Sequence, residues 1–253
     1  MVSKIERVLS IDIGGSHIKA VVLDAQGEFL EEYQRLPTPN PASPKNALEV
    51  IGELARKFTS YDAVAAGFPG YVKDGVVKTA PNLDRVAWKD YDLQRALSAL
   101  LGKEALVVND ADMQGLAIAS GKGLEMVVTL GTGFGTAFLK DGVLIPHLEI
   151  AHHPVTKKKD YDAYIGEAEL KRIGVERWNR RIKRVISILE TVFNYDRLYI
   201  SGGCAKQINF EPEDHIIITG NKDGIKGGAR LWQVENELVI YRHEMLMRME
   251  SKN

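Results

Sequence analysis

Cysteine is almost absent from the 253-residue sequence, in which Cys204 is the only one. A single thiol cannot form an internal disulfide, and it cannot supply a zinc site built from several thiolates. We therefore expect a fold held by non-covalent packing, as in proteins of the reducing cytoplasm.

The sequence also lacks long apolar runs and an excess of charge of one sign. Its formal net charge is -1, and no segment approaches the roughly 18 apolar residues that a membrane helix requires. Lys4, Glu6 and Arg7 interrupt the region where a signal peptide would have a continuous apolar stretch. We therefore predict a cytoplasmic protein with no membrane partner and no nucleic-acid partner.

Two segments of the chain share one layout, in which a strand, a glycine turn, a second strand and a tight turn follow each other. The first reads VLSIDIGGSHIKAVVLD over residues 8–24, and the second reads VVTLGTGFGTAFLKDGVLI over residues 127–145. We interpret them as one duplicated supersecondary unit. The sequence thus predicts two α/β domains, 1–110 and 111–253, with an amphipathic helix over about 233–250 that can pack back on the first domain.

The glycine turns are candidate phosphate-binding sites. A strand that runs into Gly14-Gly15 can turn sharply and present backbone N–H groups to anionic oxygens, because no Cβ atom blocks their approach. Ser16 adds a hydroxyl donor, Lys19 adds a positive charge, and Asp12 suits Mg²⁺, either directly or through water. A plain hairpin turn is the alternative for one Gly-Gly pair. The second turn, GTGFGT, occupies the equivalent place and favours a phosphate chain bound by both turns.

Acidic and basic side chains follow other predicted strands. Asp110 ends the strand EALVVND, where it fits either a catalytic base or the N-cap of the next helix, although Asp112 fits that cap better. Glu149, His152 and His153 have a spacing that fits metal ligands. No cysteine and no further clear ligand accompanies them. This favours sugar binding over metal binding, because carboxylate and imidazole groups also form hydrogen bonds with hydroxyls.

Several motifs occur in the order typical of the ROK family of sugar kinases (repressor, open reading frame, kinase): DIGGSHIK, GFPGYVKDGVVKTAPNL, NDAD, LGTGFGTA, EIAHH and SGG…GGARLW. Within that family, the chain most resembles the polyphosphate glucokinase branch through GFPG, HLEIAHHP, WNRRIKR and FNYDRLYISGG. The resemblance covers about residues 7–232. It implies an α/β fold of the actin/hexokinase/Hsp70-like (ribonuclease H-like) type, with two domains around a cleft and a five-stranded mixed sheet in each.

The resemblance also implies an activity. We expect a glucokinase that transfers a phosphoryl group from polyphosphate, ATP or both to the 6-hydroxyl of glucose, with Mg²⁺ as cofactor and as a homodimer. An ATP-dependent kinase for another hexose or an N-acetylated sugar is one alternative. A non-catalytic sugar-sensing protein of the same family is another.

The same resemblance assigns roles to single residues, and Asp110 aligns with the catalytic base. The residues that align with sugar-binding positions are Asn82, Asn109, Asp110, Glu149 and His152. Those that align with the phosphate loops are Asp12, Gly14, Gly15, Thr132 and Gly133, and those that align with the adenine end of a nucleotide site are Gly202, Gly203 and Gly227.

The chain departs from the family pattern at several places. Ala151 replaces the glycine of the family's E-x-G-H motif, and the cysteines of its zinc motif are absent from PVTKKKDYDAYIGEAEL, which implies no zinc. The sugar-binding Glu that normally follows has only Asp162 as a candidate counterpart. The basic stretches 157–159 and 171–184 fit either a solvated surface or a track for polyphosphate, and composition alone favours the surface.

Overall fold

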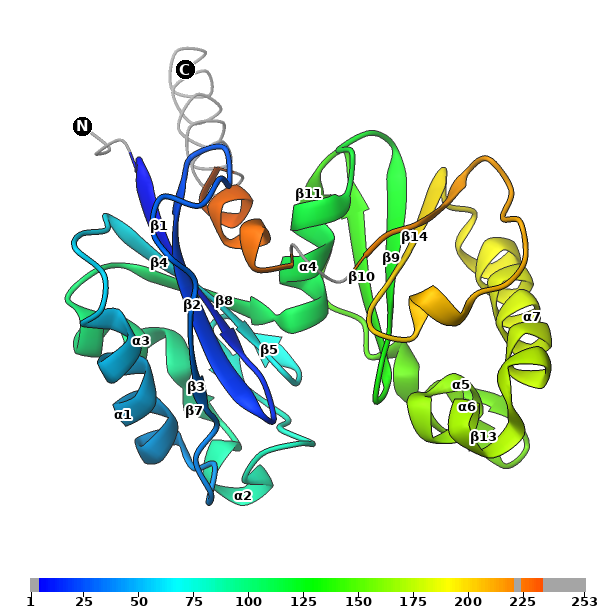
Figure 1. Cartoon of the computed structure of the whole chain (residues 1–253), viewed down its shortest axis with the longest axis horizontal. Coiled ribbons are helices and arrows are strands. Elements are labelled where there is room, and N and C mark those ends of the chain that lie inside the picture. The colour runs from blue at the N-terminus through cyan, green and yellow to red at the C-terminus, as the bar shows by residue number, and fades with distance from the viewer. Residues whose placement is uncertain (1–4, 221–223, 234–253) are drawn as a thin grey trace, which may run out of the picture. The chain divides into compact units, whose positions relative to one another are not determined.

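The computed structural model describes residues 5–220 and 224–233 (Figure 1). They divide into two compact units, one made of the described residues up to Val108 together with 225–233, and the other of Asn109–Gly224. Each unit is built on a five-stranded sheet that mixes parallel and antiparallel pairs. The predicted α/β class, with one mixed sheet in each half, is confirmed.

The first unit has the strand order β3-β2-β1-β4-β8. Its elements are β1 (Arg7–Ile13), β2 (His17–Asp24), β3 (Gln34–Pro37), α1 (Pro44–Ala55), β4 (Ala63–Phe68), β5 (Val72–Lys73), β6 (Val76–Val77), α2 (Arg85–Trp88), β7 (Tyr91–Asp92), α3 (Leu93–Leu101) and β8 (Ala105–Asn109). Alternation along β1 directs Leu9, Ile11 and Ile13 into an apolar core that α1 and α3 also enter. Figure 1 shows both helices on one side of this sheet.

The opposite face of the first sheet receives the returning segment 225–233, which begins in η3 (Gly224–Lys226). Val8 and Ala63 point to this face and pack against Trp232, whose indole Nε1 donates to Val64 O at 3.0 Å. The predicted second domain included these residues, whereas the structure places them on the first sheet. The helix expected over about 233–250 lies outside the described residues.

The second unit has the strand order β11-β10-β9-β14-β15. Its elements are α4 (Asp110–Ile118), β9 (Leu124–Leu130), β10 (Phe134–Lys140), β11 (Val143–Leu144), η1 (Ile150–His152), β12 (Pro154–Thr156), β13 (Lys159–Asp160), α5 (Tyr161–Ile165), α6 (Glu167–Ile173), α7 (Val175–Phe193), β14 (Arg197–Ser201), η2 (Ala205–Gln207) and β15 (Ile216–Ile218). β9 pairs antiparallel with β10 and parallel with β14, as β1 does with β2 and β4. The repeated layout of the sequence is therefore a repeated sheet topology.

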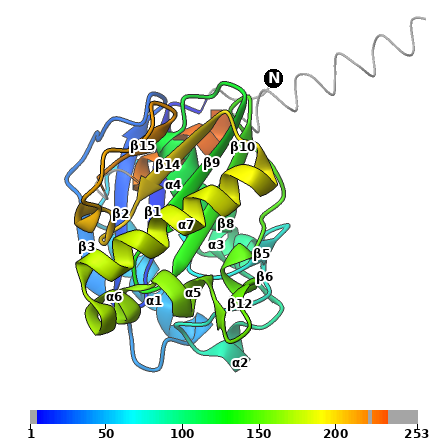
Figure 2. The same ribbon diagram turned by 90° about the vertical axis from the view of Figure 1, so that its right-hand side faces the viewer.

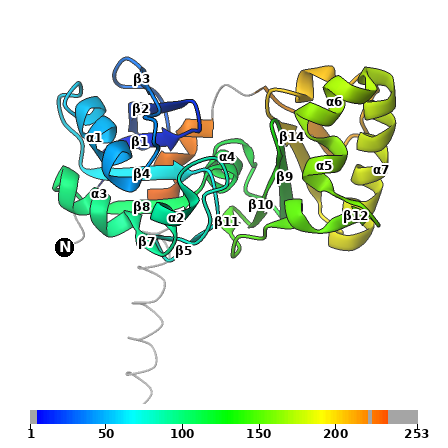
Figure 3. The same ribbon diagram turned by 90° about the horizontal axis from the view of Figure 1, so that it is seen from below.

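Helices cover both faces of the second sheet. An apolar stripe on α7, which includes Trp178, Ile182 and Leu189, packs on one face, and Figure 2 shows α7 crossing it. Figure 3 shows α5, α6 and α7 on this side of β9 and β14 and α4 on the other side. None of the described helices combines the length and apolar character that crossing a bilayer demands.

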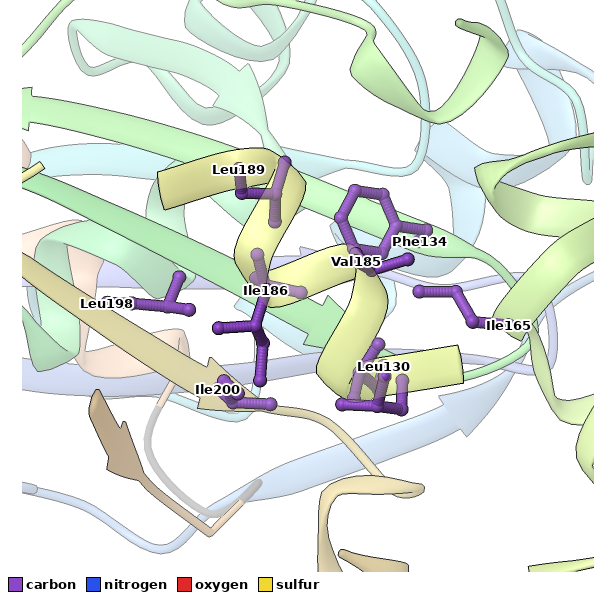
Figure 4. Close-up of a pocket in the computed structure, with 10 residues that line it drawn as sticks. Leu130, Phe134, Ile165, Val185, Ile186, Leu189, Leu198 and Ile200 are labelled. Carbon is purple, nitrogen blue, oxygen red and sulfur yellow. The ribbon is translucent and has the colours of Figure 1, made fainter. Parts of the chain in front are cut away.

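Beneath α7 lies a void of about 10 Å³ whose lining is entirely apolar (Figure 4). Leu130, Val185 and Ile186 are among the side chains that surround it. A space of this size is at the lower limit for one water molecule, and its walls offer no hydrogen-bond partner. It is a small packing defect of the core, and the functional site must lie elsewhere.

Candidate active site

The first glycine turn joins β1 to β2. Gly14 N donates to His17 O at 3.0 Å, and Thr38 Oγ1 donates to Gly14 O at 2.6 Å. A Cβ atom on Gly14 would lie 2.8 Å from His17 O, closer than real Cβ atoms approach a carbonyl, so this position requires glycine. Gly15 and Ser16 are exposed at the tip. Their backbone groups are therefore accessible to an anion.

Asp12 and Lys19 flank this turn as cross-strand neighbours in the register of β1 and β2. Lys19 Nζ lies 2.8 Å from Asp12 Oδ2, and both side chains are partly exposed. Carboxylate oxygens are ligands that Mg²⁺ prefers, and an ammonium group neutralises phosphate charge. Asn82 also lies beside the turn, because a Cβ atom on Gly15 would be 3.5 Å from Asn82 Cβ. The predicted site residues between Asp12 and Asn82 are thus brought together.

The second glycine turn joins β9 to β10 and is held by two other segments. Glu167 N, at the start of α6, donates to Gly131 O at 2.9 Å. Phe134 N donates to Asp162 Oδ1 at 2.6 Å, and a Cβ atom on Gly133 would lie 2.8 Å from the same oxygen. Burial raises the pKa of Asp162. Asp162, considered above only as a sugar-binding counterpart, therefore also shapes the predicted phosphate turn.

The segment that follows β14 lies against the second turn. Gly202 has a φ of +91°, and a Cβ atom there would overlap the backbone of Leu130, so only glycine fits. Cys204 N donates to Leu130 O at 2.9 Å. These contacts bring Thr132, predicted to bind phosphate, and Gly203, predicted to bind nucleotide, to the wall of one cavity.

This cavity, which we call the turn cavity, has a volume of about 670 Å³. Its lining residues are Gly131, Thr132, Glu167, Leu170, Lys171, Gly174, Val175, Gly203, Cys204, Lys206 and Gln207. The volume lies within the range of small-molecule sites. Lys171 is paired with Glu167 at 2.7 Å, whereas Lys206 forms no ion pair with any residue that the structure describes. Backbone amides at a glycine turn together with an exposed ammonium group suit a chain of phosphates.

Gly227 is not among the residues that line the turn cavity. It is buried in the helical segment 227–233 of the first unit. The adjacent Gly228 approaches β1 so closely that a Cβ atom would overlap Ser10 Oγ. Close packing on β1 is therefore a physical reason for Gly228, and the nucleotide-binding role of Gly227 stays a prediction.

The start of α4 corrects one expectation. Asn109 is the N-cap, and its Oδ1 accepts hydrogen bonds from Ala111 N at 2.8 Å and from Asp112 N at 3.4 Å. The prediction that Asp112 caps this helix is wrong, because the helix begins one residue after Asn109 and Asp112 already lies inside its first turn. Asp110 is the first helical residue and is exposed, with Oδ1 2.8 Å from Ala111 N. Its carboxylate is therefore accessible at the positive end of a helix.

The segment that carries Glu149 is fixed to the second sheet. Thr136 Oγ1, buried on β10, donates to Leu148 O at 2.9 Å. Glu149 then precedes η1, and its Oε2 lies 4.0 Å from His152 Nε2. The structure therefore brings together the two residues predicted to hold the sugar ring. The His152 side chain is 65% exposed, so it can reach a ligand.

A buried ion pair that was not predicted from the sequence lies beside Glu149. His147 Nδ1 lies 2.9 Å from Asp112 Oδ2, and His147 Nε2 lies 3.5 Å from Glu149 Oε1. Burial alone would lower the pKa of His147, but its contacts with the two carboxylates outweigh burial and raise that pKa to about 9. The contact with His147 lowers the pKa of Glu149, whereas burial raises the pKa of Asp112. In the sequence, His147 and Glu149 are only two residues apart, which is a local signal for their contact. Asp112 is distant in the sequence and reaches them only through the fold.

Much of the basic sequence has a structural role. Lys159, Arg172 and Arg181 all contact the buried carboxylate of Glu169, and these contacts lower its pKa. Lys183 lies over the ring of Phe210 at 4.7 Å. The pairing with Glu169 is tighter than a solvated face requires, and the choice between a solvated surface and a track for polyphosphate stays open for the rest of the segment.

Comparison with known proteins places the chain among sugar kinases. A polyphosphate glucokinase of Mycobacterium tuberculosis (strain CDC 1551 / Oshkosh) is 33% identical over 202 residues, which cover 76% of this chain and 76% of that one. The structure of the inorganic polyphosphate/ATP-glucomannokinase from Arthrobacter sp. strain KM is 31% identical, covers 90% of this chain and 99% of that chain, and superposes with a TM-score of 0.79.

More distant likeness concerns the fold alone. A ROK family glucokinase from Streptomyces griseus, solved with glucose and AMPPNP, is 19% identical, covers 89% of this chain and 98% of that chain, and has a TM-score of 0.74. The predicted actin/hexokinase-like fold is confirmed by these neighbours. A sequence model described as the ROK family matches residues 8–153, more than half of the chain. The chain therefore belongs to the ROK family.

Proposed function

We propose that this protein is a glucokinase that transfers a phosphoryl group from polyphosphate or ATP to the 6-hydroxyl of glucose. The observation that carries the proposal is the turn cavity, where the second glycine turn, Gly203 and Lys206 surround a space large enough for a phosphate donor. Support also comes from relatives named polyphosphate glucokinase and polyphosphate/ATP-glucomannokinase, each about one third identical to this chain.

In the proposed reaction, Asp110 acts as the general base. Its carboxylate accepts the proton of the 6-hydroxyl as that oxygen forms a bond to the terminal phosphorus of the donor. The bond from this phosphorus to the bridging oxygen breaks, and the shortened phosphate chain or ADP leaves with the negative charge. Exposure of Asp110 at the start of α4 is consistent with access of the hydroxyl.

The sugar is assigned to four residues besides Asp110. Glu149 and His152 supply a carboxylate and an imidazole from one short segment of the second unit. Asn109 and Asn82 are assigned as the source of amide groups. Carboxylate, imidazole and amide groups together satisfy hydroxyls that both donate and accept hydrogen bonds.

Mg²⁺ fits the first glycine turn by its chemistry. Asp12 offers a partly exposed carboxylate there, and phosphate oxygens and water would complete the coordination. When bound, the ion would neutralise charge that develops on the transferred phosphate. Gly14, Gly15, Ser16 and Lys19 would contact the phosphate oxygens themselves.

The acceptor range extends, in this proposal, to mannose. The Arthrobacter relative is named a glucomannokinase and matches 90% of this chain. Competition between glucose and mannose for one enzyme preparation would measure the preference. We further propose a homodimer in the cytoplasm, which sedimentation of the purified chain can test for its oligomeric part.

The decisive experiment offers glucose with long-chain polyphosphate or with ATP and measures glucose 6-phosphate by a coupled assay. We expect turnover with at least one donor and a loss of about 10²–10⁴-fold in kcat for Asp110→Asn. Asp141→Asn, in the exposed turn between β10 and β11, is the matched control. Glucose binding by calorimetry without transfer from either donor would instead identify a sugar sensor.

A further inference from the structure

His147 is a buried base between two carboxylates from different elements of the second unit. Asp112 belongs to α4 and approaches Nδ1 at 2.9 Å, and Glu149 precedes η1 and approaches Nε2 at 3.5 Å. The side chains of His147 and Asp112 are 6% and 8% exposed, whereas that of Glu149 is 33% exposed. One end of this row is thus enclosed, and the other end opens to ligand.

The charges around His147 favour its protonated form. A buried imidazolium is costly unless acceptors surround it, and here each ring nitrogen has a carboxylate acceptor. Other titratable groups on these elements and on α5 include Asp110 on α4, His152 on η1, and Tyr161, Asp162 and Tyr164 on α5. His152 Nε2 lies 4.0 Å from Glu149 Oε2. The two carboxylates raise the pKa of His147 to about 9, which favours an imidazolium at neutral pH, although burial raises the pKa of Asp112 in the same row.

We propose that His147, anchored by Asp112, is a positioning residue that orients the Glu149 carboxylate for the sugar and ties it to the helix that begins with Asp110. This inference rests on the proposed function, because it takes Glu149 as a sugar ligand and Asp110 as the base. It adds two residues that touch neither sugar nor donor. A carboxylate held by a fixed cation loses less conformational freedom when it binds a hydroxyl.

The first test measures the proton on His147 without any activity assay. In the full chain, nitrogen-15 NMR of the imidazole should show both nitrogens protonated at pH 7.5 and a titration near pH 9. Asp112→Asn removes one carboxylate and should move that titration toward the ordinary value of about 6.5. Titration of wild-type His147 near 6.5 would overturn the inference.

The second test separates positioning from stability through kinetics. For His147→Gln we expect KM for glucose to rise about tenfold, as for one lost charge-assisted contact, with kcat within about threefold of wild type. Above pH 9 the wild-type KM should rise as His147 loses its proton, whereas the variant should show no such limb. His215→Gln, which removes a histidine that contacts Glu190 and Glu213 instead, is the control and should keep both the KM and the pH profile. An unchanged KM in His147→Gln would refute positioning.

A double variant keeps the test informative if a buried charge left alone impairs folding. Asp112→Asn/His147→Gln replaces the ion pair by two neutral groups that can still hydrogen-bond, so stability should return toward wild type. The KM for glucose should stay raised, because no cation faces Glu149. Recovery of both stability and KM would show a structural role only and would overturn the proposal. Absence of turnover by the wild type with every donor is a different result, which refutes the proposed function.

Discussion

The two glycine turns occupy equivalent places in equivalent sheets, yet different side chains surround them. In the first, the cross-strand pair one step before the turn is Asp12 with Lys19. In the second, the pair at the same step is Thr129 with Gly135. The parallel neighbours correspond as well, since Asp12 pairs with Gly67 and Thr129 with Ser201. At this cross-strand position, the duplicated topology thus carries an ion pair in the first turn and an uncharged pair in the second.

The turns also differ in what supports them. The first is fixed by contacts within the adjoining hairpin and by Thr38, just after β3. The second depends on Asp162 from α5, on Glu167 at the start of α6 and on the segment after β14. Helices inserted between β11 and β14 therefore build a cavity at the second turn. The shared sheet topology explains where the two turns lie. The helices between β11 and β14 explain why the second turn has a cavity beside it.

The largest expected effect tests the charge difference at the turns. Asp12→Asn should lower kcat about 10²–10³-fold, the usual loss when one preorganised electrostatic contact to the transition state is removed. Thr129→Ala, at the equivalent position, should change kcat by less than about threefold, because no charge is lost. Steady-state kinetics at saturating glucose and donor measure both. Similar losses in the two variants would mean that the turns contribute alike.

A second prediction concerns the support of the second turn. Gly202→Ala should lower the free energy of unfolding by about 3 kcal/mol, because the residue combines positive φ with overlap on Leu130. The neighbouring Gly203→Ala should cost less than about 0.5 kcal/mol, since a Cβ atom there meets nothing within 4 Å. Chemical denaturation measures the difference, and hydrogen exchange should locate it in the second unit. Equal costs would contradict the close approach at Gly202.

Local patterns allowed the sheets and both turns to be predicted, because strand alternation and glycine pairs are features of neighbouring residues. Asn109 illustrates the limit, since it and Asp112 both suit an N-cap and only the observed helix start decides between them. The pair of Asp112 with His147 spans 35 residues and follows from tertiary packing, which no local spacing contains. Gly227 matched a family motif, but the chain returns to the first sheet there, and the adjacent Gly228 packs closely on β1.

A third prediction sharpens the difference in support through Glu169. This buried carboxylate binds Lys159, Arg172 and Arg181 and so fixes α6, whose first amide holds Gly131. Glu169→Gln should cost about 2 kcal/mol at pH 7, the value of hydrogen bonds to a charged group. Glu211→Gln, an exposed glutamate of the same unit, should cost almost nothing.

The pH dependence of that cost has a definite sign. Contacts with the three cations hold the pKa of Glu169 in the folded protein below its ordinary value of 4.5. The stabilisation that the Glu169 carboxylate gives the fold is therefore complete above pH 4.5, and it is lost as the pH falls through the pKa of the folded state. The difference in Tm between wild type and Glu169→Gln should therefore be constant from pH 8 to about pH 5 and shrink in more acid solution. A difference that grows on acidification would contradict the ion pairs.

The smallest expected effect concerns donor choice at the turn cavity. Lys206 lines this cavity and has no ion-pair partner in residues 5–220 and 224–233, so its charge is available to a polyanion. Lys206→Gln should raise KM about threefold to fivefold, and more for long-chain polyphosphate than for ATP, because exposed single contacts are worth little and a longer chain can contact more of the surface. Added salt should reduce the difference in KM between variant and wild type, since screening weakens the lost interaction.

Lys45→Gln, on α1 of the first unit, is the matched control and should leave the KM for both donors unchanged. An equal rise in KM for Lys206→Gln and Lys45→Gln would show a general effect of net charge. That result would contradict binding of the donor at the second turn.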